Sequence, residues 1–366
     1  MKISVITLHA VKNYGSALQS YATQKIFEDL GLETEIIDYR RKPVLYKTPM
    51  QILKSKEYSF KKKIKALLMA PSGKKAKQVF DRFLNAHIKM TDTVYTYDKD
   101  FEEKPIQADI YCTGSDQVWN SGWHNGIAYP FFLSFAPDDK KKIAFSASIG
   151  KEQLDEGEKA ETKRLLERYS AISVREASAV GIIKDLGIEN VVQVLDPTLT
   201  VTPEVWYDLA DKAKRKEKYV LVYQLCNNSK FERYAKRFAR KKKLKLIRLC
   251  TRYDQMRKPG HAVVLPEIIT FLSLFRDAEY VLTDSFHATS FSLIFHKKFG
   301  CFWPSAFATR LQSILQLTGL ESRHVADVND FNCLDGEIDY DKVDEILNKS
   351  REQTMQFLKN AVCLDK

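Results

Sequence analysis

The chain has 366 residues, of which 44% are apolar and 29% are charged, and its formal net charge is +11. That length exceeds one ordinary hydrophobic core, so two domains are expected, and the composition is that of a soluble globular protein. No window approaches the length of a membrane span and the N-terminal run lacks a signal-peptide core, which predicts a cytoplasmic protein.

Strand and helix patterns alternate through the first part of the chain. The expected elements are strands at 3–7, 34–38, 108–112 and 142–146 and helices at 16–30 and 151–169. The first strand, helix and second strand make a βαβ unit, which implies a parallel sheet. Residues from about 40 to 97, between the strands at 34–38 and 108–112, are expected to form a mainly helical, basic insertion.

A second alternating series begins near residue 171. Its expected strands cover 171–175, 191–195, 219–225, 244–249, 280–283 and 299–302. Its expected helices cover 176–186, 203–216, 229–242, 266–277, 287–295 and 309–318, and an amphipathic helix follows at 341–358. We therefore predict domains at 1–170 and 171–340, and a segment at 341–366 whose helix packs near their junction. Two parallel sheets that face each other make a cleft, and ligands bind there at the carboxyl ends of strands.

Six cysteines are scattered along the chain without C-x-x-C or any other zinc-ligand spacing. We expect reduced, mostly structural thiols in a reducing compartment. No carboxylate cage is visible in the sequence, so we expect neither an obligatory metal nor a bound cofactor.

Positive charge gathers in two clusters, one from Lys54 to Lys77 and the other from Arg233 to Lys245. Nucleic acid, an anionic membrane surface and phosphorylated small substrates would each attract such clusters. The second cluster alternates with an inward apolar stripe at helical spacing, which favours a solvated helix face. In the first, residues 60–70 alternate lysines with large apolar side chains, which suits a helix lying on the inner membrane surface. A merely solvated face is the alternative there.

The run Thr283-Asp284-Ser285-Phe286-His287-Ala288-Thr289-Ser290 lies between an expected strand and an expected helix. Ser285 is a good N-cap, which places Phe286 and His287 in the first helical turn. Unpaired backbone N–H groups and the helix dipole favour an anion there, and an imidazole beside an anion suits phosphate chemistry. The alternative is a histidine that bonds a neighbouring carbonyl.

Two earlier strand-to-helix loops are candidates for substrate binding. The first contains Asn13, Tyr14, Gly15 and Ser16, where Gly15 would allow close backbone approach and Ser16 would cap the helix. It lacks the full G-x-G-x-x-G pattern of dinucleotide sites, and an ordinary loop is the alternative. 

The second candidate loop contains Gly114, Ser115 and Asp116, followed by Trp119. It mixes small, polar and aromatic residues, as a sugar-binding surface would require. A capped turn with Trp119 in the core is the alternative.

Two arginines stand where an anion could be held. Arg175 ends an apolar strand, where a buried charge needs either a protein partner such as Glu176 or an anionic substrate. Arg310 opens a late helix after a loop rich in Pro and Phe, and it reaches either the cleft or the surface. The turn Asp196-Pro197-Thr198 favours a structural role.

The order of these motifs resembles that of the polysaccharide pyruvyl transferase family. The motifs are NYGSALQSYATQKIFEDLG, IIDYR, TGSDQVWN, ISVREASAV, LDPT and LTDSFHATSFSLIF. The resemblance runs from Lys2 to about Arg323, and the last motif is the most diagnostic. Members usually have glycine after the histidine, where this chain has Ala288.

The resemblance implies a GT-B-like α/β fold, with two Rossmann-like parallel-sheet domains around a central cleft. It implies transfer of the enolpyruvyl carbons of phosphoenolpyruvate to two hydroxyls of a sugar, which gives a pyruvate ketal and phosphate. Arg175 and His287 match the family residues that contact phosphoenolpyruvate. The acceptor would belong to a surface polysaccharide or to its lipid-linked precursor.

Two other functions remain open on the sequence. One is a GT-B glycosyltransferase that uses a nucleotide sugar, because similarity of fold does not fix the reaction. The other is a non-catalytic protein that binds nucleic acid or a membrane surface, motivated by the charge of +11. We expect no nucleic-acid partner, because the lysines surround no recognised nucleic-acid motif.

Overall fold

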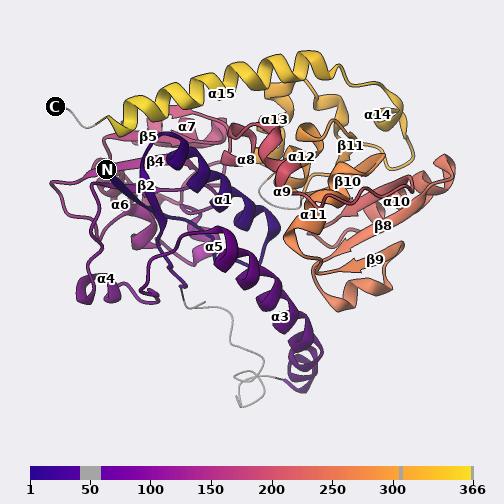
Figure 1. Ribbon diagram of the computed structural model, residues 1–366, viewed down its shortest axis with the longest axis horizontal. Helices are drawn as coiled ribbons and strands as arrows, with labels where there is room; N and C mark the ends of the chain where they lie inside the picture. The colour runs from indigo at the N-terminus through magenta and orange to yellow at the C-terminus, as the bar shows by residue number, and fades with distance from the viewer. Residues whose placement is uncertain (42–58, 305–307, 364–366) are drawn as a thin grey trace.

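The computed structural model describes residues 1–41, 59–304 and 308–363, and it contains two parallel β-sheets that lie side by side (Figure 1). Part of the predicted basic insertion, including Lys54 and Lys56, lies outside the described residues, as do residues 305–307 in the loop before Thr309. Among the described helices, none has the length and apolar composition needed to cross a bilayer.

The first sheet has six strands in the order β2-β1-β3-β4-β5-β6, and every neighbouring pair is parallel. Its strands are β1 (Lys2–Ile6), β2 (Glu33–Ile36), β3 (Ile110–Thr113), β4 (Lys141–Ala147), β5 (Ala171–Val174) and β6 (Val191–Gln193). All residues of β3 are buried, as expected of a central parallel strand with both faces covered.

The second sheet has five strands in the order β11-β10-β7-β8-β9, again all parallel. Its strands are β7 (Tyr219–Tyr223), β8 (Lys245–Cys250), β9 (His261–Val264), β10 (Tyr280–Thr283) and β11 (Lys298–Cys301). The sequence analysis missed β9, a short edge strand whose residues are only partly buried and so carry little apolar pattern.

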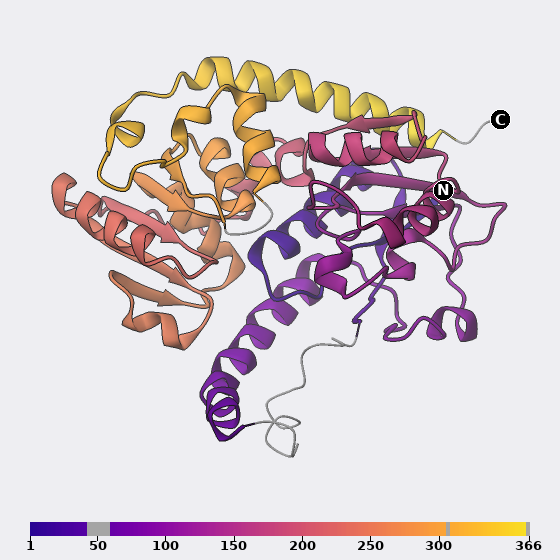
Figure 2. The ribbon, with the colours of Figure 1, turned by 180° about the vertical axis from the view of Figure 1, so that it is seen from behind.

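Helices cover both sheets (Figures 1 and 2). Those that begin in the first half of the chain are α1 (Tyr14–Asp29), α3 (Phe60–His87), α4 (Asp100–Glu103), α5 (Ser121–His124), the 3-10 turn η1 (Tyr129–Phe132), α6 (Glu156–Leu166) and α7 (Ala177–Asp185). The others are α8 (Pro197–Thr200), α9 (Pro203–Leu209), α10 (Ser229–Lys242), η2 (Tyr253–Arg257), α11 (Ile268–Arg276), α12 (Phe286–Ile294), α13 (Thr309–Thr318), η3 (Glu321–Arg323), α14 (Asn332–Asp335) and α15 (Tyr340–Val362).

The boundary expected at residue 170 does not coincide with the edge of a sheet. Strand β5 pairs with β4, and β6 pairs with β5, so the first sheet continues to Gln193. The second sheet begins only at Tyr219. The strand starting at 171 was predicted, but its apolar pattern could not tell which sheet it would join, because both are parallel and buried.

Helix α15 runs back from the second sheet across the first (Figure 1). The hydroxyl of its Thr354 accepts a hydrogen bond from the backbone N–H of Leu195 at 3.2 Å. Its Arg351 Nε donates to the carbonyl of Leu199 at 2.7 Å. These bonds hold the segment between the two sheets, which follows β6 and includes α8, against the C-terminal helix.

Candidate active site

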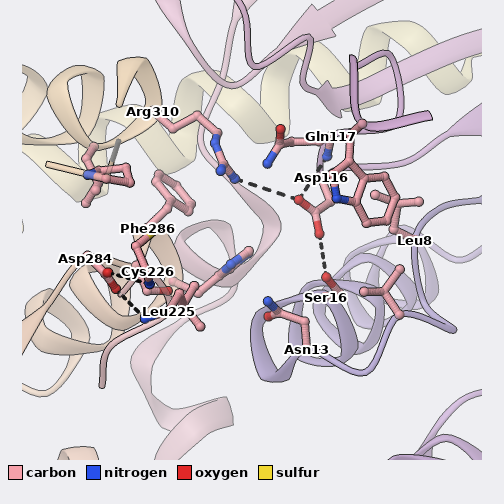
Figure 3. A pocket seen from close by; sticks show the side chains of 16 residues that line it. Leu8, Asn13, Ser16, Asp116, Gln117, Leu225, Cys226, Asp284, Phe286 and Arg310 are labelled. Carbon is pink, nitrogen blue, oxygen red and sulfur yellow. Dashed lines mark hydrogen bonds and ion pairs between the residues drawn. The ribbon is translucent and has the colours of Figure 1, made fainter. Parts of the chain in front are cut away.

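A cavity of about 200 Å³ lies where loops at the carboxyl ends of both sheets meet (Figure 3). The loops after β1 and β3 come from the first sheet, and those after β7 and β10 come from the second. In parallel α/β proteins this edge is where ligands bind, because strand ends and helix N-termini converge there.

The strand-to-helix turn after β10 has the predicted form. The Ser285 side chain caps α12 by accepting from the backbone N–H of Ala288 at 3.5 Å, so His287 lies in the first turn. The Thr283 hydroxyl accepts from the N–H of Ser285 at 3.0 Å and donates to the carbonyl of Tyr223 at 2.8 Å. The turn is thereby tied to the neighbouring strand β7, and both Ser285 and His287 line the cavity.

Gly15 makes room for the imidazole of His287. A β-carbon at Gly15 would lie 2.0 Å from Nδ1 and 2.2 Å from Cγ of His287, so only glycine permits this approach. The glycine was expected to admit a substrate to the backbone. Instead its open face is filled by a side chain from the other sheet, and the two helix N-termini meet directly.

Ser16 does not cap α1, contrary to expectation. The helix begins at Tyr14, and the Asn13 side chain caps it by accepting from the N–H of Gly15 at 2.9 Å. Ser16 therefore lies inside the first turn, where its hydroxyl donates to Oδ2 of Asp116 at 2.5 Å. This bond links the first and second candidate loops (Figure 3).

Tyr14 joins the two halves of the molecule outside the cavity. Its ring is stacked on Phe271 of α11, with centroids 4.3 Å apart and planes within 5°. Its hydroxyl donates to the carbonyl of Pro266 at 2.7 Å. Since the side chain is buried, this contact fixes the start of α1 against the second sheet and with it the position of Gly15.

The guanidinium of Arg175 is the centre of a buried charge cluster. It donates through Nη1 to Oδ2 of Asp196 at 2.8 Å and through Nη2 to Oδ1 of Asp116 at 3.2 Å. Glu176 lies 3.8 Å from Nε, and the ring of Phe286 lies 4.8 Å from Cζ. The side chain is 0% exposed and does not line the main cavity. It borders a smaller cavity of about 120 Å³ on the other side of Phe286.

Asp116 faces both the cavity and this cluster. Its φ of 77° is unusual for a residue other than glycine and costs about 1–3 kcal/mol, which the surrounding bonds must offset. Its carbonyl accepts from the N–H groups of Val118 and Ser148 at 2.7 and 3.1 Å. Burial raises the pKa of its carboxyl, but the charges of Arg175, His287 and Arg310 outweigh burial and hold that pKa well below its usual range.

Asp196 lies behind His287. The carboxyl accepts from the hydroxyl of Ser115 at 3.0 Å and from the hydroxyl and N–H of Thr198 at 2.6 and 2.9 Å. Its Oδ2 lies 3.8 Å from Nε2 of His287, too far for a hydrogen bond but close enough to stabilise an imidazolium. The turn favoured as structural therefore also supports the candidate acid.

His287 is held as a neutral imidazole. Burial lowers its pKa to about 4, although the carboxylates of Asp196 and Asp116 oppose that shift. Within the described residues, its Nε2 atom has no hydrogen-bond partner. An unpaired buried nitrogen beside a cavity can exchange a proton with a bound molecule.

Arg310 brings an incompletely neutralised positive charge to the cavity wall. Its side chain is 16% exposed, and Nη1 lies 3.9 Å from Oδ1 of Asp116, its ion-pair partner in Figure 3. Burial, followed by repulsion from Arg175, lowers its pKa to about 10. The guanidinium remains protonated at neutral pH, and an anion in the cavity would stabilise it.

Asp284 shapes the opposite wall. Its two carboxylate oxygens accept from the backbone N–H groups of Leu225 and Cys226 at 2.7 and 2.8 Å, as Figure 3 shows. Burial raises its pKa despite these bonds. The residue therefore fixes the loop after β7, which forms part of the cavity lining.

A family model described as polysaccharide pyruvyl transferase matches residues 13–305. The chain belongs to the polysaccharide pyruvyl transferase family. It is therefore an enzyme of a pyruvyl-transferring family, as the order of its motifs indicated. A search of curated proteins finds no match.

Two solved structures are similar to this chain over nearly its whole length. The S. aureus MnaA–UDP co-structure is 11% identical, with a TM-score of 0.52 over 97% of this chain and 91% of that one. Arabidopsis thaliana UGT89C1 is 9% identical, with a TM-score of 0.51 over 99% of both chains. These similarities confirm the GT-B-like fold and do not extend to the reaction.

The cavity lining contains seven of the twelve site residues predicted from the sequence and lacks the other five. Those that line it are Asn13, Ser16, Asp116, Ser285, Phe286, His287 and Arg310. Those outside are Tyr14, Gly15, Gly114, Ser115 and Arg175. Of these, Gly15 lies against His287 and Arg175 bonds Asp116, and both partners line the cavity. Among the described residues, no group of three or more potential ligands could hold a metal ion.

The lining of the cavity in this pyruvyl transferase family member also includes Trp123, which was not predicted from the sequence. Trp119 is buried in the core, as its alternative reading expected, whereas Trp123 lines the cavity and is 45% exposed. Gln117 lies beside it in the lining. An exposed indole in polar surroundings can stack on a sugar ring, and its position just after the TGSDQVWN motif was the available signal.

We predict that Gly15→Ala destabilises the protein by about 1–3 kcal/mol, because the new methyl group overlaps the imidazole of His287. Urea unfolding provides the measurement. The matched control is Gly181→Ala in α7, where a β-carbon meets nothing within 4 Å and helix propensity should favour alanine. Equal effects at both positions would contradict the proposed contact.

A second prediction concerns stability below neutral pH. The pKa of His287 is lower in the folded chain, at about 4, than its ordinary value of 6.5, so the unfolded chain binds more protons in this interval. The free energy of unfolding should therefore fall on acidification from pH 6.5 to 4, by at most about 1.4 kcal/mol per pH unit for this group. His124, whose pKa burial also lowers to about 4, adds a similar contribution.

Unfolding titrations at several pH values would separate the two histidines. His287→Gln and His124→Gln should each flatten the pH dependence, and the double variant should flatten it further. An unchanged slope in His287→Gln would show that this imidazole titrates normally.

Proposed function

We propose that the protein transfers the enolpyruvyl carbons of phosphoenolpyruvate to two hydroxyls of one sugar, which yields a cyclic pyruvate ketal and phosphate. The acceptor is a sugar of a surface polysaccharide or of its lipid-linked precursor. The proposal includes a peripheral contact with the inner membrane surface, where a lipid-linked sugar would be presented. Family membership and a cavity that pairs a neutral histidine with an incompletely neutralised arginine support it.

The donor would occupy the cavity between Arg310 and the N-terminus of α12. There the guanidinium makes paired bonds to the carboxylate or phosphate, and backbone N–H groups of the first turn assist. Arg175, predicted from the sequence to touch the donor, is enclosed by Asp116 and Asp196. In the proposed arrangement it acts as a positioning residue that fixes both carboxylates.

Charge balance couples donor binding to proton uptake. Three carboxylates, those of Asp116, Glu176 and Asp196, stand against the two guanidiniums of Arg175 and Arg310. With His287 neutral the cluster does not favour a multiply charged anion. A bound phosphate dianion raises the pKa of His287 by opposite charge, so the imidazole would take up a proton when the donor binds.

The protonated imidazole is then a suitable acid. It delivers its proton to the methylene carbon of phosphoenolpyruvate, and a sugar hydroxyl attacks the adjacent carbon, returning a proton to the histidine. The second hydroxyl attacks the same carbon as its bond to the phosphate oxygen breaks, and the remaining proton leaves with phosphate. One C–H bond, two C–O bonds and one O–H bond on the phosphate form, and the C=C π bond, one C–O bond and the two O–H bonds of the sugar break.

The acceptor would lie on the side of the cavity built by the first sheet. Trp123 offers its exposed face to a sugar ring, and the side chains of Gln117 and Asn13 border the same space. This arrangement places the two hydroxyls toward the donor, between the two sheets. It also explains a lining that is cationic on one side and aromatic with amides on the other.

The experiment that tests the function incubates the protein with phosphoenolpyruvate and a panel of lipid-linked sugars, and searches for the ketal product by mass spectrometry. With an accepted sugar, His287→Ala should lower the rate of phosphate release by about 10²- to 10⁴-fold, because the acid is lost. Turnover close to that of the unmodified protein would rule out His287 as the acid.

Donor binding can be measured without an acceptor. Phosphoenolpyruvate should protect the protein against heat more strongly at pH 6 than at pH 8, because binding requires a proton on His287. Both phosphoenolpyruvate and His287 contribute to this pH dependence. In His287→Ala only the contribution of the ligand should remain. UDP alone should give no protection. Protection by UDP and none by phosphoenolpyruvate would instead favour a nucleotide-sugar glycosyltransferase.

A further prediction separates the donor and acceptor sides. Arg310→Lys should raise the KM for phosphoenolpyruvate about tenfold, because an ammonium cannot make the paired contact. Trp123→Ala should raise the KM for the sugar by roughly three- to tenfold and leave protection by phosphoenolpyruvate unchanged. Arg310→Lys should leave the KM for the sugar unchanged, and Trp123→Ala should leave the KM for phosphoenolpyruvate unchanged.

Arg175→Lys tests the positioning role. It should lower thermal stability, since an ammonium cannot bridge Asp116 and Asp196 in the same way. A raised KM for phosphoenolpyruvate with unchanged stability would instead show that Arg175 contacts the donor directly.

A further inference from the structure

Exposed apolar side chains gather on two elements that are far apart in the sequence. Helix α3 exposes Ile64, Leu67 and Leu68 by 42, 59 and 69%, and turn η2 exposes Tyr253 and Met256 by 37 and 54%. We call these five residues the α3–η2 face. Large apolar side chains so open to water are costly to leave unpartnered when they cluster.

The two elements of this face are held together. The hydroxyl of Ser72 in α3 accepts from the backbone N–H of Tyr253 at 2.9 Å, and Lys75 Nζ donates to the carbonyl of Val264 at 2.7 Å. The later part of α3 is anchored in the core by buried Val79 and Phe80. Figure 1 shows the beginning of the helix projecting from the body of the molecule. The face is therefore presented by a fixed support.

Basic residues accompany the face. Lys74 and Arg257 are exposed on the same two elements, and Lys63 is partly exposed one residue before Ile64. The other basic cluster, on α10, lacks this combination. There Phe231, Tyr234 and Phe238 are fully buried, and only charged residues such as Lys236 and Arg240 face outward. Both basic clusters carry positive charge, but only the one on α3 and η2 combines it with exposed apolar side chains.

We propose that the α3–η2 face binds the surface of an anionic phospholipid bilayer. The lysines and arginine are attracted to the headgroups, while the leucines, isoleucine and methionine enter the boundary with the acyl chains. A nucleic acid would satisfy the charges but would leave the aliphatic side chains in water. The combination of both features therefore favours a membrane.

Helix α3, which carries part of this face, contacts the loop that borders the cavity. Lys12 Nζ donates to the carbonyl of Gly73 in α3 at 3.4 Å, and its neighbours Val11 and Asn13 line the cavity. From Gly73 to Leu68 is roughly 8 Å along the helix axis. Given the proposed function, a membrane-bound chain would find the acceptor sugar attached to a lipid, and the substrate class is then a lipid-linked saccharide.

The test is co-sedimentation of the full chain with vesicles of phosphatidylcholine alone or of phosphatidylcholine with about 30% phosphatidylglycerol. The second composition supplies the anionic headgroups that attract basic segments. We expect binding to the anionic vesicles that salt weakens. Leu67→Ser with Leu68→Ser should weaken partitioning roughly tenfold, and so should Lys63→Glu with Lys74→Glu. Both pairs lie on exposed or partly exposed positions, and circular dichroism checks that the fold is kept.

The matched control carries two charge reversals on the other basic cluster, Lys236→Glu with Arg240→Glu, and should bind as the unmodified chain does. Absence of binding, or equal loss from the control, would overturn the proposal. Binding that depends on charge but not on the leucines, or equal binding to single-stranded RNA, would show a general affinity for polyanions instead. Protection by phosphoenolpyruvate is independent of all these variants, so failure of membrane binding is separable from failure of the proposed transfer reaction.

Discussion

The buried guanidinium of Arg175 is the interaction on which the site depends. It comes from the end of β5 and holds Asp116, from the loop after β3, and Asp196, from the turn after β6. Three strand ends of the first sheet are thereby fixed relative to one another. Removing one partner of such a buried pair commonly lowers the free energy of unfolding by about 3–5 kcal/mol, because the remaining charge is left buried without a partner. That loss is on the order of a third of the stability of a typical domain.

Both carboxylates held by Arg175 also face residues from the second half of the chain. Asp196 lies 3.8 Å from the imidazole of His287, and Asp116 lies 3.9 Å from the guanidinium of Arg310. A single buried cation thus determines the electrostatic surroundings of the acid and of the cationic residue that line the cavity. This explains how a residue without access to the main cavity can still belong to the machinery of the site.

Direct contact between the sheets determines the geometry of the cavity. Gly15, the second residue of α1, packs against the imidazole of His287, and Tyr14, the first residue, is stacked on Phe271 of α11. The position of His287 is therefore set by packing across the interface as much as by its own helix. Burial in this interface also lowers the pKa of His287 to about 4, and the proposed mechanism therefore requires a bound anion to drive proton uptake.

Local signals were sufficient for most of the fold. Apolar runs of four to six residues, alternating with capped helical patterns, specify parallel α/β halves, and the N-cap at Ser285 placed His287 in the first turn of α12. The edge strand β9, where the apolar pattern is weak, was not predicted. Strand β5 was predicted, but its pattern did not tell which sheet it would join. Buried strands of two parallel sheets have the same composition, so only pairing decides which sheet a strand joins.

Most candidate residues were identified from the sequence, but the contacts that distinguish their roles were not. Gly15 and Ser16 belong to a recognisable loop, yet only the approach of His287 explains the glycine, and only the neighbourhood of Asp116 explains the serine. Arg175 lies just before helix α7, and Arg310 lies in the first turn of helix α13. The sequence alone determined that charged groups collect at strand ends. The tertiary structure decided which guanidinium is enclosed by carboxylates and which meets the cavity, because burial and neutralisation depend on contacts between separate segments of the chain.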